Sequence, residues 1–292
     1  MEKDFYRIWK TAHNRSINID YKPLIMAIIN VTPNSFSDGG DYLIAEKAIS
    51  HSINCLEEGA DIIDIGGEST NPNAVPISAK EEQARIIPVI EELSNITDAI
   101  ISVDTYRSET AKLAIRAGAH IINDVFGLQH DKNMAATIAK YGAGVCIMHT
   151  GRNRTKLCEV FEDQFYFLKK SLEIAFREGI NRDCIVLDPG FGFSKNTKEN
   201  LSIIADFSKF NQLDFPILVG VSRKRFLGKI TGRNRSLDRD CSTAVANCLL
   251  RVAGANIFRV HNVKINIDAL RLTDAVIQSK SIYTHDSLGD KE

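Results

Sequence analysis

The chain has 292 residues, of which 44% are hydrophobic and 25% are charged, and its formal net charge is −1. This composition is ordinary for a globular protein, and the near-neutral charge argues against a nucleic-acid-binding protein. The first ten residues, MEKDFYRIWK, lack the apolar core of a secretory signal, and no apolar stretch is long enough to cross a bilayer. The six cysteines show neither a CxxC pair nor the spacing of a zinc site. We therefore expect a single domain in the cytoplasm, with reduced thiols and without membrane or nucleic-acid partners.

Eight short apolar runs recur along the chain, separated by segments long enough for helices. The runs cover residues 24–29, 62–65, 100–103, 121–122, 144–147, 185–187, 217–221 and 257–260. Continuous apolar runs are typical of parallel strands that are buried on both faces. Their alternation with helices predicts an α/β fold, a single (β/α)8 TIM barrel over residues 24–278. Residues 1–23 are expected to pack over the bottom of the barrel as a hairpin or short helix, and residues 279–292 to form a frayed tail.

The segments between the runs divide into loops and helices. Residues 30–42 and 66–78 are rich in Asn, Ser, Pro and Gly, which predicts two long loops above the barrel. Ser78 precedes a helix, and Glu81, three residues later, would complete a capping box. Apolar periodicity predicts the other main helices at residues 44–58, 107–117, 131–141, 161–178, 237–252 and 265–278.

Acidic and amide side chains close three of the runs, at Asp104, Asn123 and Asp188. The carboxyl ends of the strands form the active-site rim of such a barrel, so these side chains are expected to point into its mouth. Any one of them could equally cap the helix that follows. Three at one rim favour a ligand, because buried carboxylates need partners. A ligand edge with a row of N–H donors, such as that of a guanidine-like heterocycle, would satisfy them.

Cationic residues gather after the last two runs. Ser222, Arg223 and Lys224 follow the seventh run, and Arg259 and His261 lie at the eighth. Loops after the last two strands of a barrel often hold phosphate. The wider basic run up to residue 235 could instead be a nucleic-acid patch, which the near-neutral net charge disfavours. We expect Lys224 and Arg259 to face the mouth and bind an anion there.

The turn after the sixth run, DPGFGFSK at residues 188–195, lacks the GKS/T ending of a nucleotide phosphate loop. Phe191 is expected in the core, whereas Phe193 could stack on a planar ligand. His149 ends the fifth run, where a structural role is at least as plausible as a catalytic one. Because the chain contains neither HxH nor HExxH, no zinc site is expected. A magnesium ion carried by a diphosphate would need few protein ligands, and Asn30 is a candidate.

Seven segments match one known family in that family's own order. They are NVTPNSFSDGG (30–40), DIIDIGGEST (61–70), ISVDTYR (101–107), GAHIINDVFG (118–127), LDPGFGF (187–193), LVGVSRKRFLG (218–228) and RVHNV (259–263). Through these segments the chain resembles dihydropteroate synthase over nearly its whole length. The resemblance implies a condensation of hydroxymethyl-dihydropterin diphosphate with 4-aminobenzoate, which gives dihydropteroate and diphosphate in folate synthesis. It also implies a dissociative mechanism, in which the C–O bond to the diphosphate breaks first.

The resemblance also implies roles for individual residues. Catalysis would involve Asp38, Lys224, Arg259 and His261, with Asp38 on a closing loop that stabilises the pterin cation. The pterin would be bound by Asp104, Asn123, Met148, Asp188, Phe193, Lys224 and Arg259. The diphosphate would be held by Asn30, Arg259 and His261, with Mg²⁺ at Asn30, and the 4-aminobenzoate pocket would be formed by Phe36, Thr70, Pro72 and Ser222. The family further implies a homodimer through outer helices late in the chain.

Several positions depart from the usual family pattern. Asn71 stands where an arginine is common, and Asn34 and Asn262 stand where aspartate is usual. Thr150 is shorter than the residue that normally precedes the glycine, and Arg225 is bulkier than the small residue often found there. None of these changes removes a pterin contact, but Asn71 and the polar loop after the fifth run bear on 4-aminobenzoate binding. Two alternatives therefore stay open, namely a paralogue that binds the pterin diphosphate without using 4-aminobenzoate, and a methyltetrahydrofolate-binding methyltransferase domain that serves a corrinoid partner.

Overall fold

The computed structural model describes residues 8–19, 22–32, 41–68 and 75–286, with the backbone alone at 41–43 and 280–286. Eight parallel strands form its main sheet: β3 (Leu24–Asn30), β4 (Ile62–Gly66), β5 (Ile100–Asp104), β6 (Ile121–Asp124), β7 (Gly144–Met148), β8 (Ile185–Asp188), β9 (Leu218–Val219) and β10 (Ile257–Val260). Their order in the sheet is β8-β7-β6-β5-β4-β3-β10-β9. A parallel bridge between Leu187 and Ile217 joins its two ends, so the sheet closes into the predicted barrel.

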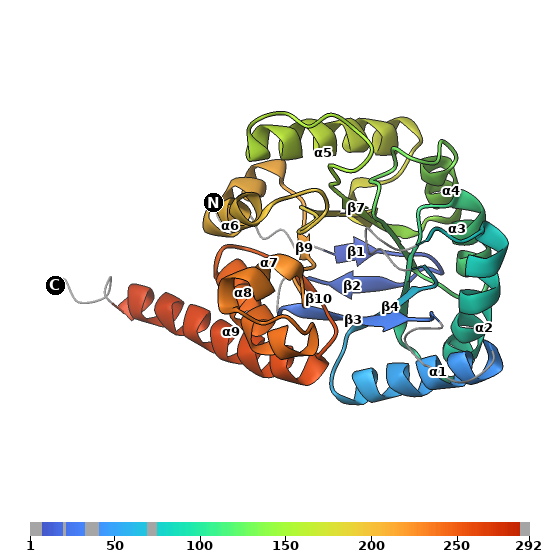
Figure 1. The fold of residues 1–292 in the computed structure, drawn as a ribbon, viewed down its shortest axis with the longest axis horizontal. Coiled ribbons are helices and arrows are strands. Elements are labelled where there is room, and N and C mark those ends of the chain that lie inside the picture. The colour runs from blue at the N-terminus through green and yellow to red at the C-terminus, as the bar shows by residue number, and fades with distance from the viewer. Residues whose placement is uncertain (1–7, 20–21, 33–40, 69–74, 287–292) are drawn as a thin grey trace.

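The helices surround the strands as an outer ring (Figure 1). They are α1 (Asp41–Glu57), α2 (Ala79–Ile96), α3 (Ser108–Arg116), α4 (Met134–Tyr141), α5 (Val160–Arg177), α6 (Thr197–Ala205), α7 (Arg225–Thr231), α8 (Asp240–Val252) and α9 (Val263–Asp286). Short 3-10 helices at Arg182–Cys184, Phe207–Leu213 and Leu237–Arg239 lie in the connections. Each barrel strand is thus followed by at least one helix, as the apolar pattern predicts.

A two-stranded antiparallel hairpin, β1 (Ile8–Lys10) and β2 (Ser16–Asn18), lies at the amino-terminal end of the barrel. Its Trp9 is 1% exposed and packs with apolar residues that begin the strands, such as Ile62. The Trp9 indole N–H donates to the carbonyl oxygen of Cys184 at 2.9 Å. Apolar side chains therefore fill this end of the barrel, and the polar side chains described below lie towards the other end.

The predicted capping box at the start of α2 forms only in part. Ser78 accepts the backbone N–H of Glu81 at 3.2 Å, but the Glu81 carboxylate pairs with Arg85 at 2.6 Å. Arg85 lies one turn further along the helix. Its charged guanidinium is a stronger hydrogen-bond donor to the Glu81 carboxylate than the backbone N–H of Ser78 would be. A complete capping box begins α6 instead, between Asn196 and Glu199.

Several elements differ in length from the sequence prediction. The strand β9 is shorter than the expected run at 217–221, and at its start the Asn256 side chain accepts the Ile217 N–H at 3.0 Å. The helix α9 continues beyond Gln278 to Asp286, so part of the expected tail is helical. Among the described helices, none combines the length and the apolar character needed to span a membrane.

Candidate functional site

An arginine bridges two carboxylates inside the barrel, near the carboxyl ends of its strands. Arg259 of β10 donates through Nε to Asp64 Oδ2 of β4 at 2.6 Å, and through Nη2 to Asp104 Oδ2 of β5 at 2.7 Å. Burial raises the pKa of Asp104 to about 7, and the Arg259 guanidinium opposes this shift. Burial alone would lower the pKa of Arg259, but Asp64 and Asp104 raise it. The three side chains therefore act as one buried charged unit.

Among the described residues, two buried oxygen atoms in and beside this unit lack a hydrogen-bond donor. Asn123 of β6 donates through Nδ2 to Asp64 Oδ2 at 3.3 Å. Within the described parts of the chain, Asn123 Oδ1 and Asp64 Oδ1 are buried and have no hydrogen-bond partner. Leaving a buried acceptor without a donor costs free energy, and native proteins rarely do so without a reason. The N–H groups of a ligand would satisfy both oxygens.

Asp188 and Lys224 add a buried carboxylate and a partly buried cation to the same mouth. Asp188 ends β8 and accepts the Gly190 N–H through Oδ1 at 2.7 Å. Burial raises the pKa of Asp188 to about 6, although the Gly190 N–H and the Lys224 ammonium favour the ionised form. Burial and the positive charge of Arg259 lower the pKa of Lys224 to about 8. Acidic and basic side chains that the sequence predicts at the strand ends therefore lie together in the mouth.

A small apolar cluster lies beside these charges. Val125, Met148 and Phe193 are buried and pack together. The centroid of the Phe193 ring lies 4.6 Å from Lys224 Nζ and 4.3 Å from Arg152 Cζ. Cations over an aromatic face are attracted by its quadrupole, which helps to fix the ring. An apolar wall of this kind suits a planar heteroaromatic ligand.

Ser222 and His261 form one hydrogen-bonded unit. Ser222 Oγ accepts the backbone N–H of His261 at 3.1 Å and lies 2.9 Å from His261 Nδ1. Burial, with the cations of Arg223 and Arg259, lowers the pKa of His261 to about 3. The imidazole is therefore neutral near pH 7, and we infer from its partners that Nδ1 accepts the serine hydroxyl while Nε2 carries the proton. The family resemblance assigns Ser222 to the 4-aminobenzoate pocket and His261 to the diphosphate. In the structure, the two side chains are joined by a hydrogen bond.

Arg223 ties the loop after β9 to α8 and does not join the bridging arginine in the mouth. Its Nε and Nη2 pair with both carboxylate oxygens of Asp240, at 2.6 and 2.8 Å. Asn262, at a position where aspartate is usual, donates to the same carboxylate at 3.1 Å. An aspartate there would repel Asp240, so the amide fits this partner better. Arg225, the bulky departure at the start of α7, is exposed.

Asn30 is the candidate magnesium ligand. It ends β3 opposite Gly66 of β4 and is half-buried, and its amide oxygen is a donor of the kind that Mg²⁺ prefers. No three His, Cys, Asp or Glu side chains converge on a possible metal position in the described ranges. A magnesium ion at Asn30 would therefore need further oxygen ligands from its substrate and from water. The predicted residues Phe36, Asp38, Thr70 and Pro72, and the departures Asn34 and Asn71, lie outside the described residues.

Two residues of this region were not identified from the sequence. Asp64 stands inside an apolar strand, and an isolated charge there is itself a signal that a buried partner exists. Arg107 pairs with Glu68 Oε2 at 2.7 Å and donates to the Ile77 carbonyl oxygen at 2.8 Å. Glu68 and Ile77 stand near the two ends of the connection between β4 and α2, so Arg107 ties those ends together. No local pattern around Arg107 indicated this role.

Related sequences and structures identify the family. The family model described as "pterin binding enzyme" matches residues 26–261. The chain belongs to this family. It is similar to the dihydropteroate synthase of Bacillus subtilis, with 38% identity over 94% of this chain and 96% of that protein. Two solved structures are also similar. One is dihydropteroate synthase of Clostridium difficile in the presence of pteroic acid, with 41% identity and a TM-score of 0.86 over 89% of this chain and 98% of that chain. The other is dihydropteroate synthase of Xanthomonas albilineans with 4-aminobenzoic acid, with 38% identity and a TM-score of 0.87 over 92% of this chain and 98% of that chain.

Membership of the pterin-binding enzymes confirms the resemblance found in the sequence, and the shared fold confirms the TIM barrel. It also gives the mouth a ligand of the right chemistry. A pterin ring carries N–H donors along one edge, which is what the buried oxygens of Asn123 and Asp64 lack.

Pterin binding should weaken in acid, because a carboxylate must be ionised to accept the N–H groups of the ring. The pKa of Asp188 is about 6 in the free protein, so below that pH binding has to displace a proton. We expect the dissociation constant for pterin, measured by calorimetry, to rise by up to about tenfold for each pH unit below 6. In Asp188→Asn, binding should be weak and the pH dependence should be reduced to the part that comes from Asp104, whose pKa is about 7. An affinity in the wild-type protein that does not change between pH 5 and pH 7 would contradict the role of Asp188.

Proposed function

We propose that this chain catalyses the dihydropteroate synthase reaction. It condenses 6-hydroxymethyl-7,8-dihydropterin diphosphate with 4-aminobenzoate and releases 7,8-dihydropteroate and diphosphate, a step of folate synthesis. The observation that carries the proposal is that one mouth holds partly buried cations together with buried acceptors that have no partner among the described residues. The acceptors suit the donor-rich edge of a pterin, and the cations suit a diphosphate. Similar proteins solved with pteroic acid and with 4-aminobenzoic acid support both halves of the reaction.

The pterin would lie against the apolar cluster, with its N–H edge turned to the buried oxygens. Its contacts would come from Asp104, Asn123, Met148, Asp188, Phe193, Lys224 and Arg259. Lys224 can only donate, so it would serve an acceptor atom of the ring beside Asp188. Arg259 would hold Asp64 and Asp104 in place before the ligand arrives, because its guanidinium bonds to both carboxyl groups.

The diphosphate would be held by Arg259, His261 and Asn30. Arg259 would supply positive charge, while neutral His261 would donate a hydrogen bond from Nε2. Asn30 would supply one ligand to a magnesium ion that arrives with the diphosphate. When bound there, magnesium supplies further positive charge to the departing anion.

The proposed reaction is dissociative. The C–O bond to the diphosphate would break first, with its electron pair leaving on the oxygen, and the pterin would stabilise the resulting cation. The amine of 4-aminobenzoate would then form the C–N bond and lose one proton. Because that amine is already a nucleophile, excluding water matters more than a strong base. Asp38 would stabilise the cation, and Phe36, Thr70, Pro72 and Ser222 would form the 4-aminobenzoate pocket.

The activity is tested by diphosphate release from the full chain with pterin diphosphate, Mg²⁺ and 4-aminobenzoate. Release should depend on 4-aminobenzoate, and Lys224→Ala and Asp188→Asn should each lower kcat/KM by about a hundredfold or more, because each leaves a buried polar partner unsatisfied. The exposed controls Lys229→Ala and Asp206→Asn should behave like the wild type. Pterin diphosphate that binds without any turnover would support the paralogue instead, and affinity for methyltetrahydrofolate alone would support the methyltransferase domain.

We also propose that the protein is a homodimer. An apolar groove of about 630 Å³ opens between α6, α7 and α8. Ile230, Val245 and Leu249 line it, and each is more than half exposed, which is unusual for a surface that stays in water. Arg233 and Asp238 also line the groove, and opposite charges on one patch can pair across a two-fold axis. A second copy of this chain would therefore cover both the apolar floor and its charges.

Replacing Val245 by Asp should dissociate this dimer, because a carboxylate would be buried in an apolar interface. Sedimentation of the full chain at micromolar concentration should give a dimer for the wild type and a monomer for Val245→Asp. The control is Leu272→Asp on α9, whose side chain is 69% exposed and does not line the groove. A monomeric wild type, or a dimeric Val245→Asp, would contradict the proposal.

We further propose that the protein works in the cytoplasm. All six of its cysteines are free thiols, which suits a reducing compartment. Cys158 is exposed, so an oxidising compartment would leave its thiol open to modification.

A further inference from the structure

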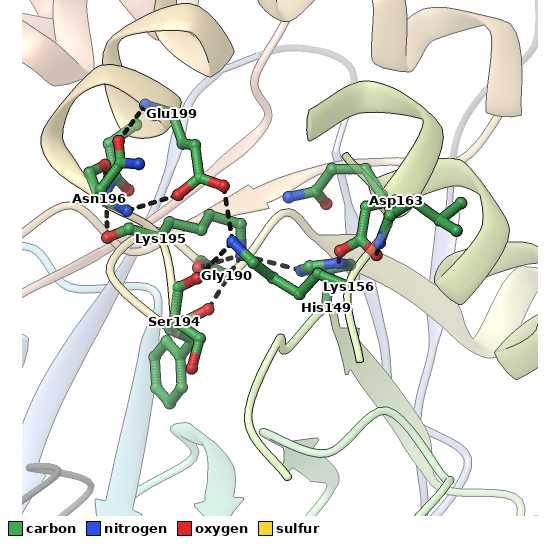
Figure 2. A network of polar contacts seen from close by, with 12 residues as sticks. His149, Lys156, Asp163, Gly190, Ser194, Lys195, Asn196 and Glu199 are labelled. Carbon is green, nitrogen blue, oxygen red and sulfur yellow. Dashed lines mark hydrogen bonds and ion pairs between the residues drawn. The ribbon is translucent and has the colours of Figure 1, made fainter. Parts of the chain in front are cut away.

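A buried polar network lies next to the apolar cluster of the mouth and joins the loop after β7 to the turn after β8. Figure 2 shows Lys195 between Gly190 and His149. Its Nζ lies 2.8 Å from His149 Nδ1 and 2.8 Å from the carbonyl oxygen of Gly190. On the other side of the imidazole ring, His149 Nε2 lies 3.0 Å from Asp163 Oδ2. His149 is 1% exposed, so these contacts form away from water.

Both ring nitrogens of His149 are held by this network. Nδ1 lies 2.8 Å from Lys195 Nζ, and Nε2 lies 3.0 Å from Asp163 Oδ2 and 2.8 Å from Arg154 Nη2. Burial, with the nearby charge of Lys195, lowers the pKa of His149 to about 3, which agrees with a neutral ring. Burial opposes ionisation of Asp163, but hydrogen bonds from His149 and Arg154 hold its pKa below the usual range. The imidazole therefore connects a fixed carboxylate to the lysine.

The network holds Gly190, which lies in the turn between two predicted pterin contacts, Asp188 and Phe193. Asp188 Oδ1 accepts the Gly190 N–H at 2.7 Å, while Lys195 donates to the Gly190 carbonyl oxygen. Gly190 has a φ of +64°, and a Cβ atom there would lie 1.9 Å from the His149 carbonyl oxygen. The same turn continues to Phe193, whose N–H donates to Gly190 O at 3.2 Å. A substitution of Lys195 would therefore shift the positions of both Asp188 and Phe193.

We propose that Lys195 is a positioning residue for the pterin site. By joining Gly190 to His149, it holds Asp188 and Phe193 where the pterin ring meets them. This inference rests on the proposed function, and it goes further by assigning the pterin half of the site, and not the 4-aminobenzoate half, to the Lys195–His149–Asp163 network. Lys195 itself bonds to the backbone and to His149, so its effect on the ligand passes through the residues that it holds.

A second lysine of the same two loops provides a matched control. Lys156 Nζ donates to the Ser194 carbonyl oxygen at 2.8 Å and pairs with Glu199 Oε1 at 2.6 Å. It thus also bonds a lysine to a carbonyl of the turn after β8, as Figure 2 shows, but its side chain is 29% exposed and it contacts neither Gly190 nor His149 in any described bond. Lys156→Met removes a charge and two hydrogen bonds, but it leaves the hydrogen bond between Lys195 and Gly190 in place.

The test compares Lys195→Met with Lys156→Met in the full-length protein. In Lys195→Met, the dissociation constant for pterin and the KM for the pterin diphosphate should rise about tenfold, which corresponds to about 1.4 kcal/mol. The KM for 4-aminobenzoate should change by less than about twofold, and Lys156→Met should leave all three values within about twofold. A general loss of structure would raise both KM values together, so the split between the substrates separates positioning from folding.

Three further variants, Lys195→Gln, His149→Phe and the two combined, keep the test decisive if Lys195→Met folds poorly. Lys195→Gln retains N–H donors on a shorter side chain and should show an intermediate loss of pterin affinity. His149→Phe combined with Lys195→Gln should lose little more than the worse single variant, because residues that act through one another are not additive. Unchanged pterin affinity in Lys195→Gln and Lys195→Met, or equal losses for both substrates, would overturn the inference. A folded wild-type protein that binds no pterin would instead overturn the proposed function, and this inference with it.

Discussion

The burial of charge at one end of the barrel is the constraint on which the rest of the structure depends. Arg259 lies between Asp64 and Asp104, and any one of these side chains would be costly to bury alone. Arg259 pairs with both carboxyl groups while, within the described residues, Asn123 Oδ1 and Asp64 Oδ1 lack donors. A protein that served only its own stability would satisfy or remove these oxygens. Their presence is best explained by a ligand that completes the site.

The two ends of the barrel have different roles: one is packed with apolar side chains, and the other carries the polar side chains of the site. At the amino-terminal end, Trp9 and the apolar residues that begin the strands form a packed interior. At the carboxyl end, β4, β5, β6, β8 and β10 bring polar side chains to the mouth, and the connecting loops help to hold those side chains in place. Arg107 ties the ends of one connection, and the Lys195–His149 pair grips the turn after β8. Precision in the site therefore comes largely from residues that would not touch the ligand.

The sequence was sufficient to predict the barrel and much of its rim, because both follow from local patterns. Apolar runs mark strands buried on both faces, and Asp104, Asn123 and Asp188 stand out because they close such runs. Phe191 was correctly predicted in the core. Asp64 was missed because it lies within a run, and the partners of His149 were missed because they lie 14 and 46 residues away. Contacts of that kind depend on how the loops fold over the barrel, which no local spacing encodes.

The central claim is that the unpartnered buried oxygens exist to receive a pterin. It is tested most directly by a crystal structure of this protein with pteroic acid bound. The account predicts that N–H groups of the pterin ring lie within hydrogen-bond distance of Asn123 Oδ1 and the Asp188 carboxylate, with the ring packed beside Met148 and Phe193. A pterin bound elsewhere on the barrel, with Asn123 Oδ1 still lacking a donor, would contradict it.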